Sequence, residues 1–370
     1  MATATNRALI NPISSLFLYV LLFESRGLCE SVPGMYIFGD SLVDVGNNNY
    51  MPASFAKANN PHNGIDFPSG KPTGRFSNGK NAADFLAEKV GLPSPSPYLS
   101  LVSNSNELSD ISDLVTGVSF ASGGAGIFNG SDEIFGQSIP LTKQVGYYSI
   151  VHDKLVQHMG SDKAQAHLSK SLFFVVIGSN DLLDYFNKNP RASKDYTPEE
   201  YVDLMVSTLK GLYQRLYELG ARKFVVSGVS MIGCCPAQRR QNATSECNVE
   251  ANYWSINYND GLRSLLRGLK RESSDIHYSY FDTYRVMDSI IQDPEFYGIT
   301  EIKAACCGRG KLKADGKCTI FSTYCSNRKN HLFWDLYHPT EHTSSIFANM
   351  IYSGPQPVTD PMNVEQLVDV

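Results

Sequence analysis

The sequence lacks the patterns that mark several large classes of protein. Its 370 residues contain no Cys-x-x-Cys pair, which argues against the common structural zinc sites, and no Gly-x-Ser-x-Gly elbow, which argues against an α/β-hydrolase. Its 37 acidic residues outnumber 32 lysines and arginines, so the net charge of −5 provides no basic footprint for nucleic acid. Beyond the N-terminus, no stretch approaches the ~20 apolar residues of a membrane helix. We therefore expect no nucleic-acid partner and no integral membrane segment beyond the N-terminus.

The composition is that of a globular protein, with 42% hydrophobic, 11% aromatic and 19% charged residues. At the N-terminus, Arg7 precedes an apolar run over residues 13–23. This run is too short to span a bilayer but suits the apolar part of a secretory signal peptide; a buried helix is the alternative. We expect residues 1–29 to be the signal peptide, cleaved between 25 and 31, and the mature protein to be secreted to the extracellular space.

The cysteines beyond this segment fall into two local clusters, which is typical of disulfide-stapled loops in an oxidising compartment. They are Cys234, Cys235, Cys247, Cys306, Cys307, Cys318 and Cys325. Their odd number leaves one thiol unpaired. Acceptor sequences for N-glycans begin at Asn129 and Asn242 and are consistent with secretion.

Short apolar runs that indicate buried strands alternate with segments of helical spacing. The expected strands are residues 35–38, 117–121, 172–177, 224–227 and 276–281. The expected helices are 81–90, 198–219 after a capping box at Thr197, and 251–271. This alternation predicts a parallel sheet between helical layers. We expect one α/β domain over residues 33–355 and a C-terminal tail over 356–370.

Polar residues gather directly after three of these strands, at Asp40-Ser41, Gly123-Gly124 and Asn180-Asp181. Ligands of open parallel sheets bind beyond the carboxyl ends of the strands, where the strand order reverses. The three turns therefore predict a site at that edge.

Ser41 is the candidate nucleophile, and a hydroxyl needs a base that a third group orients. His338 is the candidate base because Asp335 precedes it by three residues, a spacing that places two side chains together. Asp335 would then fix the imidazole tautomer while the other ring nitrogen faces Ser41. The alternative is a zinc site in which His342 and Glu341 join this pair.

The oxyanion of such a reaction needs hydrogen-bond donors. The backbone N–H groups of Ser41 and Gly123 are candidates, and the Asn180 side chain can add a third donor. Taken alone, the glycines can be a flexible turn and Asn180 a turn-forming residue.

Four ordered blocks together resemble the GDSL, or SGNH, serine hydrolases, in particular their plant-type secreted branch. They are Phe38-Gly-Asp-Ser-Leu-Val-Asp-Val-Gly-Asn-Asn-Asn49, Gly117-Val-Ser-Phe-Ala-Ser-Gly-Gly-Ala-Gly-Ile127, Ile177-Gly-Ser-Asn-Asp181 and Phe333-Trp-Asp-Leu-Tyr-His-Pro-Thr-Glu341. The resemblance covers residues 32–353, nearly the whole expected mature chain.

The resemblance implies a flavodoxin-like three-layer α/β/α sandwich with about five parallel strands, and no metal or cofactor. It assigns Ser41, His338 and Asp335 to a catalytic triad, and the Ser41 amide, Asn180 and a glycine, Gly123 or alternatively Gly124, to the oxyanion hole. Asp40 and Asp181 would order their turns. It also implies a Cys234–Cys247 bridge and two bridges among Cys306, Cys307, Cys318 and Cys325, leaving Cys235 over. One departure is Ser119, where the family usually has Asn.

We therefore expect a secreted serine esterase or lipase that hydrolyses acyl esters through an acyl-enzyme. An acyltransferase with an alcohol or sugar acceptor would use the same residues. A non-catalytic protein that binds sugar or lipid is the third hypothesis.

Overall fold

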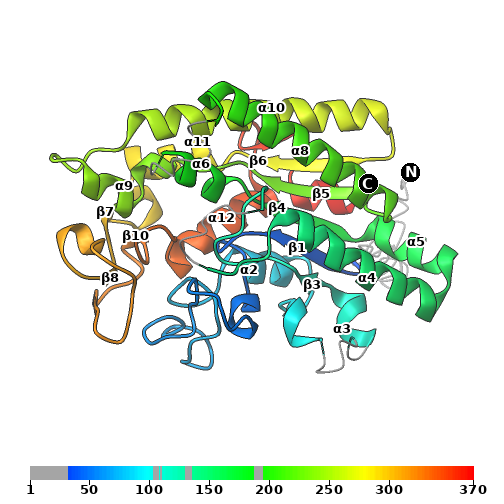
Figure 1. The fold of residues 1–370 in the computed structure, drawn as a ribbon, viewed down its shortest axis with the longest axis horizontal. Coiled ribbons are helices and arrows are strands. Elements are labelled where there is room, and N and C mark those ends of the chain that lie inside the picture. The colour runs from blue at the N-terminus through cyan, green and yellow to red at the C-terminus, as the bar shows by residue number, and fades with distance from the viewer. Residues whose placement is uncertain (1–31, 103–107, 109–110, 130–135, 187–194) are drawn as a thin grey trace, which may run out of the picture.

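A central sheet of seven strands organises the chain (Figure 1). The computed structural model describes residues 32–102, 108, 111–129, 136–186 and 195–370, so the expected signal peptide lies outside the described residues. In sheet order, the strands are β11 (Thr359–Asp360), β6 (His277–Phe281), β5 (Lys223–Ser227), β4 (Leu172–Val176), β1 (Met35–Gly39), β3 (Val118–Ser119) and β2 (Ser96–Pro97). All neighbours pair in parallel except β11, which is antiparallel to β6.

The central strands β1 and β4 are largely apolar because both faces of the sheet are buried there. Along β4, Phe173 and Val175 pack into one hydrophobic cluster, while Phe174 and Val176 pack into the other. This alternation follows from the two-residue period of a strand.

Helices cover both faces of the sheet. One face packs against α3 (Ile111–Thr116), α4 (Leu141–Met159), α5 (Ser161–Lys170), α6 (Ser179–Phe186), α8 (Pro198–Glu218) and α10 (Val249–Glu272). The other face packs against α2 (Ala82–Lys89), α9 (Pro236–Gln241), α11 (Thr283–Gln292), α12 (Glu341–Ser353) and α13 (Val364–Val368). Short 3-10 turns are η1 (Asn47–Tyr50), η2 (Tyr98–Ser100), η4 (Ile232–Cys234), η5 (Glu295–Tyr297) and η6 (Lys311–Lys313). Among the described helices, none combines the length and the apolar character needed to cross a bilayer.

Two small sheets form a lobe at one end of the molecule, drawn in yellow to orange in Figure 1. β7 (Glu301–Ala305) pairs with β10 (His331–Phe333), and β8 (Cys307–Gly308) pairs with β9 (Thr323–Tyr324). Disulfides join Cys306 to Cys325 and Cys307 to Cys318 within this lobe.

The structure confirms the α/β fold with a mostly parallel sheet, and the capping box of Thr197 and Glu200 begins α8 as expected. Two expectations are corrected. The sheet has seven strands rather than about five, because the two-residue strands β2 and β11 extend it at its edges. The last residues are not a tail: β11 joins the sheet, and α13 buries Val364 and Leu367 completely. Because α13 is only five residues long, its apolar spacing was too weak a sequence signal to predict a helix.

Candidate active site

The predicted site residues meet at the carboxyl ends of three adjacent strands, β3, β1 and β4. Ser41 follows β1, the glycine turn follows β3, and Asn180 lies in the first turn of α6 after β4. The chain places β3 on one side of β1 and β4 on the other, so the strand order reverses here. This is the position at which open α/β sheets bind ligands.

Ser41, His338 and Asp335 form one chain of hydrogen bonds. His338 Nε2 lies 2.7 Å from Ser41 Oγ, and His338 Nδ1 lies 2.7 Å from Asp335 Oδ1. His338 and Asp335 are buried, whereas Ser41 is partly exposed. The arrangement leaves the hydroxyl within reach of a ligand while its base and the carboxylate are shielded from water.

The segment between β10 and α12 fixes the Asp335–His338 pair. The backbone N–H groups of Tyr337 and His338 both donate to Asp335 Oδ1 at 3.0 Å, so the carboxylate holds its own loop. Trp334 is completely buried against the disulfides of the lobe, and the Cys307 N–H donates to the Trp334 carbonyl at 2.7 Å. The disulfide lobe is therefore packed directly against the loop that carries the base.

Burial and charge act in opposite directions on the carboxylates around this site. Burial alone would raise the pKa of Asp335, but the charge and hydrogen bond of His338 and the two backbone amides outweigh it and lower that pKa below its ordinary value. Burial raises the pKa of Asp40 to about 7, opposed by the Leu42 amide, which donates to Asp40 Oδ1 at 2.9 Å. Asp335 thus stays ionised beside the imidazole.

The glycine turn differs from the prediction in one respect. The Gly123 N–H donates to Asp44 Oδ2 at 3.0 Å, so that amide is already occupied. Gly124, with φ +78°, lines the same cavity as Ser41 and Asn180. Among the described residues, neither the Gly124 N–H nor the Ser41 N–H has a hydrogen-bond acceptor. Gly124 is therefore the better-placed donor of the two glycines.

The other polar side chains of the three turns form hydrogen bonds to backbone groups. One Asn180 amide hydrogen goes to the Ala125 carbonyl at 2.8 Å, which leaves the second for a ligand. The carboxylate of Asp181 accepts the Ile127 N–H at 3.0 Å and the Phe128 N–H at 3.3 Å. Asp181 thereby anchors the chain just after the glycine turn.

The glycine turn is held in place by three residues that the sequence analysis did not single out, namely Asp44, Asn47 and Asn48. Asp44 Oδ1 accepts the amides of Gly46 and Asn47 at 2.7 and 2.8 Å, while its Oδ2 takes that of Gly123. Asn47 Nδ2 donates to the carbonyls of Ser119 and Ala121, and Asn48 Nδ2 to that of Gly123, all at 2.8 Å.

The Ser119 hydroxyl, which replaces the family's Asn, is buried without a hydrogen-bond partner among the described residues. It therefore does not help to hold the glycine turn, which is anchored by Asp44, Asn47 and Asn48 instead.

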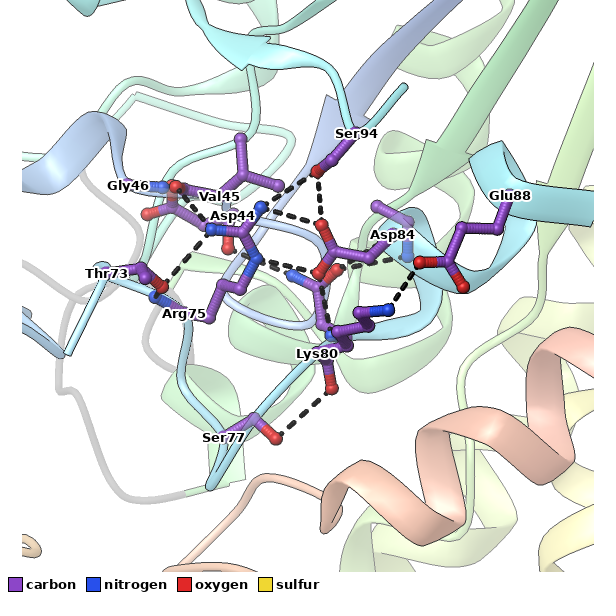
Figure 2. A network of polar contacts seen from close by, with 12 residues as sticks. Asp44, Val45, Gly46, Thr73, Arg75, Ser77, Lys80, Asp84, Glu88 and Ser94 are labelled. Carbon is purple, nitrogen blue, oxygen red and sulfur yellow. Dashed lines mark hydrogen bonds and ion pairs between the residues drawn. The ribbon is translucent and has the colours of Figure 1, made fainter. Parts of the chain in front are cut away.

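A buried ion pair fixes the segment that follows this loop (Figure 2). Arg75 Nε donates to Asp84 Oδ2 at 2.7 Å, and its second nitrogen lies 2.6 Å from Asp84 Oδ1. Arg75 also donates to the Val45 carbonyl at 3.2 Å, and Ser94 completes the network. The pair therefore ties the first helix turn of α2 to the loop of Asp44.

The next residue, Phe76, contacts the candidate base His338. Its ring centroid lies 4.9 Å from that of His338, and a Cβ added to Gly123 would stand 2.4 Å from Phe76 Cζ. Phe76 thus packs between the imidazole and the glycine turn. Nothing in the sequence shows which side chain this phenylalanine contacts.

The remaining predicted residues lie apart from this centre. Cys234 is bonded to Cys247, and Cys235 is free and buried. Asn129 is exposed, and the Asn242 side chain accepts hydrogen bonds from Thr244. Two members of the alternative zinc set have other partners. His342 Nε2 lies 2.9 Å from the Tyr297 carbonyl, and Glu341 Oε1 accepts the Lys80 amide at 2.9 Å.

A mostly apolar cavity of about 290 Å³ opens at Ser41. The triad, Gly124 and Asn180 belong to its polar part. Ala56 and Ala58 line another part of it, as does the Gly316–Cys318 stretch of the disulfide lobe. An activated hydroxyl, three candidate oxyanion donors and an apolar cavity suit acyl transfer from an apolar ester.

Comparison with known proteins supports the same chemistry. The family model described as GDSL-like Lipase/Acylhydrolase matches residues 35–351. A GDSL esterase/lipase of Arabidopsis thaliana is 48% identical over 98% of this chain and 99% of its own length. A second GDSL esterase/lipase of the same plant is 38% identical over 97% of this chain and 98% of its own.

Proposed function

The chain belongs to the GDSL-like lipase/acylhydrolase family of carboxylic ester hydrolases, and from this premise we propose that it cleaves acyl esters through a triad of Ser41, His338 and Asp335. The observation that carries the proposal is the continuous hydrogen-bond chain from Ser41 Oγ through both nitrogens of His338 to Asp335.

In the acylation step, Ser41 Oγ attacks the ester carbonyl carbon as His338 Nε2 takes the hydroxyl proton. Asp335 accepts a hydrogen bond from His338 Nδ1 and stabilises the imidazolium that forms. The C–O bond to the alcohol then breaks, and His338 returns the proton to that leaving oxygen. The product of this half-reaction is a Ser41 ester.

The charge that develops on the carbonyl oxygen needs donors that are already in place. The free N–H groups of Ser41 and Gly124 and the second amide hydrogen of Asn180 line the cavity at this point. Each such donor typically contributes ~3–4 kcal/mol in the transition state. Gly124 replaces Gly123 in this role because Asp44 holds the Gly123 amide.

Deacylation repeats these steps with water. His338 removes a proton from water, the hydroxide adds to the acyl carbon, and Ser41 leaves with that proton while the acid is released. An alcohol or sugar in place of water would make the enzyme an acyltransferase. Hydrolysis is favoured because Ser41 is partly exposed, which gives water access to the acyl-enzyme.

We further propose that the protein is secreted. The three disulfides among the described residues and the N-terminal apolar run are those expected of a chain that passes through an oxidising compartment. Asn129 and Asn242 would then carry N-glycans, because both are accessible on the surface.

The test is hydrolysis of p-nitrophenyl acetate, butyrate and palmitate by the purified protein, beside Ser41→Ala and His338→Ala. We expect turnover to fall by at least ~10³-fold in both variants with unchanged circular dichroism. Undiminished turnover in Ser41→Ala would refute the proposed nucleophile. Adding an alcohol and analysing the products would show a new ester if the chain is a transferase.

A further inference from the structure

The cavity at Ser41 extends inward beneath the sheet edge, into the layer between the sheet and α11–α12. Val176, Ser227 and Phe281 stand in one row across β4, β5 and β6, and all three line the cavity. Phe174, two residues further inside on the same face of β4, lines it too. Since a strand rises about 3.3 Å per residue, the cavity reaches roughly 7 Å below the sheet edge.

Helix α12 forms the opposite wall of this inner part. Ser344, Phe347 and Ile351 line the cavity from one face of the helix, at a spacing of three and four residues. Because a helix rises 1.5 Å per residue, the seven steps from Ser344 to Ile351 span about 10 Å. Ser344 is nearest along the chain to His338, and Ile351 is two turns further on.

The inner part offers a ligand almost nothing polar. Its walls from the sheet, α11 and α12 carry no charged side chain among the described lining residues. Of the three hydroxyls on these walls, those of Ser227 and Thr283 are hydrogen-bonded to each other at 2.6 Å, and the third is that of Ser344 at the end of α12 nearest His338 along the chain. Transfer of methylene groups from water to such walls is favourable, whereas a polar group would lose its hydrogen bonds there.

We propose that this inner part holds the acyl chain of the substrate, and that Ser344, Phe347 and Ile351 set the chain length the enzyme accepts. The inference rests on the proposed function, in which the acyl carbon becomes attached to Ser41. The substrates are then esters of unbranched apolar acids long enough to reach along α12. The alcohol part leaves on the open side of Ser41, toward the Gly316–Cys318 wall.

The first test narrows the cavity near its entrance. Ser344 is buried, and Ser344→Phe places a ring in the inner part, with Ser344→Leu as a milder version. We expect kcat/KM for p-nitrophenyl octanoate and palmitate to fall at least tenfold more than kcat/KM for the acetate ester. An equal loss on every ester, or no loss on any in folded protein, would overturn the inference.

The second test deepens the cavity. Ile351→Ala removes side-chain volume at the far end, and Ile290→Ala is the matched control, because Ile290 is buried in the same hydrophobic cluster but does not line the cavity. Ile351→Ala should raise the palmitate-to-butyrate ratio of kcat/KM several-fold, and Ile290→Ala should leave it unchanged. Equal ratios in the two variants would contradict the assignment.

A third measurement separates failure of this inference from failure of the proposed function. Wild-type and variant proteins are labelled with p-nitrophenyl phosphonates that carry a methyl or an octyl group, with Ser41→Ala as the blank. If Ser41 is labelled but Ser344→Phe slows both reagents equally, the acyl-chain site is wrong and the nucleophile stands. If neither reagent labels Ser41, the proposed function fails, and the inference fails with it.

Discussion

At the scale of single residues, the proposed catalytic centre depends on side chains that hold the main chain in place. The clearest case is Gly123. Its carbonyl accepts a hydrogen bond from the Asn48 side chain, and its N–H donates one to Asp44. Its Cα faces the ring of Phe76. Every side of this residue is occupied, so even one added methyl group must displace a neighbour. The neighbour in the way is the ring that packs on His338.

We predict that Gly123→Ala lowers kcat sharply in a protein that still folds. The new Cβ would stand 2.4 Å from Phe76 Cζ and 2.9 Å from Asn48 Nδ2, so the ring and the turn must move apart. A displacement of about 1 Å at a catalytic group can cost ~100-fold in rate. Steady-state kinetics beside Gly146→Ala, a helix position with open space, measure this effect. Equal kcat values in the two variants would show that Phe76 does not position the imidazole.

Asp44 gives a prediction about pH. Burial raises the pKa of Asp44 to about 6, although the amides of Gly46, Gly123 and Asn47 act against it. The folded protein therefore binds this proton more tightly than the unfolded chain, whose carboxyl has a pKa of about 3.9. Its contribution to stability is greatest below pH ~4 and is lost as the pH rises toward 6.

Asp44→Asn removes this titration, so its free energy of unfolding should depend less steeply on pH between 4 and 6. Between pH 4 and pH 6, the free energy of unfolding should change by about 2–3 kcal/mol less in Asp44→Asn than in the wild type. Urea unfolding of both proteins at several pH values is the measurement. Parallel curves for the two proteins would mean that Asp44 is not protonated in this range.

At the scale of elements, a loop with little regular structure is held by a buried ion pair. Arg75 and Asp84 have side chains only 7% and 2% exposed, and they connect the loop before α2 to its first turn. Removing one partner of a buried pair leaves an uncompensated charge. The exposed pair of Lys80 and Glu88 in the same network has side chains 26% and 50% exposed and is worth far less.

We predict that Arg75→Met destabilises the fold by about 3–5 kcal/mol, whereas Lys80→Met costs under about 1 kcal/mol. Chemical denaturation of the two variants compares them directly. Losses of similar size would indicate that the buried pair contributes no more than the surface pair.

How much of this could be predicted from the sequence depends on the range of the interactions. Asp335 and His338 were found because a three-residue spacing brings them together, and α8 because its capping box is local. The choice between Gly123 and Gly124 was not decidable, since it depends on Asp44 from a loop 79 residues away. The partner of Arg75 and the packing of α13 are likewise set by tertiary contacts. Sequence periodicity does not encode such contacts.

At the scale of the whole molecule, the disulfide lobe and the α/β core both form the proposed active site. The core supplies Ser41 and the proposed oxyanion donors, while the lobe packs against Trp334 and lines the cavity through Cys318. A substitution that disturbs the lobe should therefore also lower kcat/KM. The Cys234–Cys247 bridge, of similar span, does not line the cavity.

We predict that replacing both Cys307 and Cys318 with Ser costs about 2–3 kcal/mol of stability and also lowers kcat/KM. Replacing Cys234 and Cys247 should cost a similar amount of stability with little change in kcat/KM. Thermal unfolding and ester hydrolysis below the transition report the two effects separately. An unaltered kcat/KM in the Cys307/Cys318 variant would show that the disulfide lobe does not influence the proposed active site.

The central claim is that Ser41 becomes covalently acylated with His338 as its base. The most direct measurement is labelling with a p-nitrophenyl alkylphosphonate, followed by mass-spectrometric mapping of the modified peptide, in wild type and His338→Ala. The account predicts one adduct, on Ser41, forming at least ~10³-fold more slowly without His338. An adduct on another serine, or labelling of Ser41 at the same rate in His338→Ala, would contradict it.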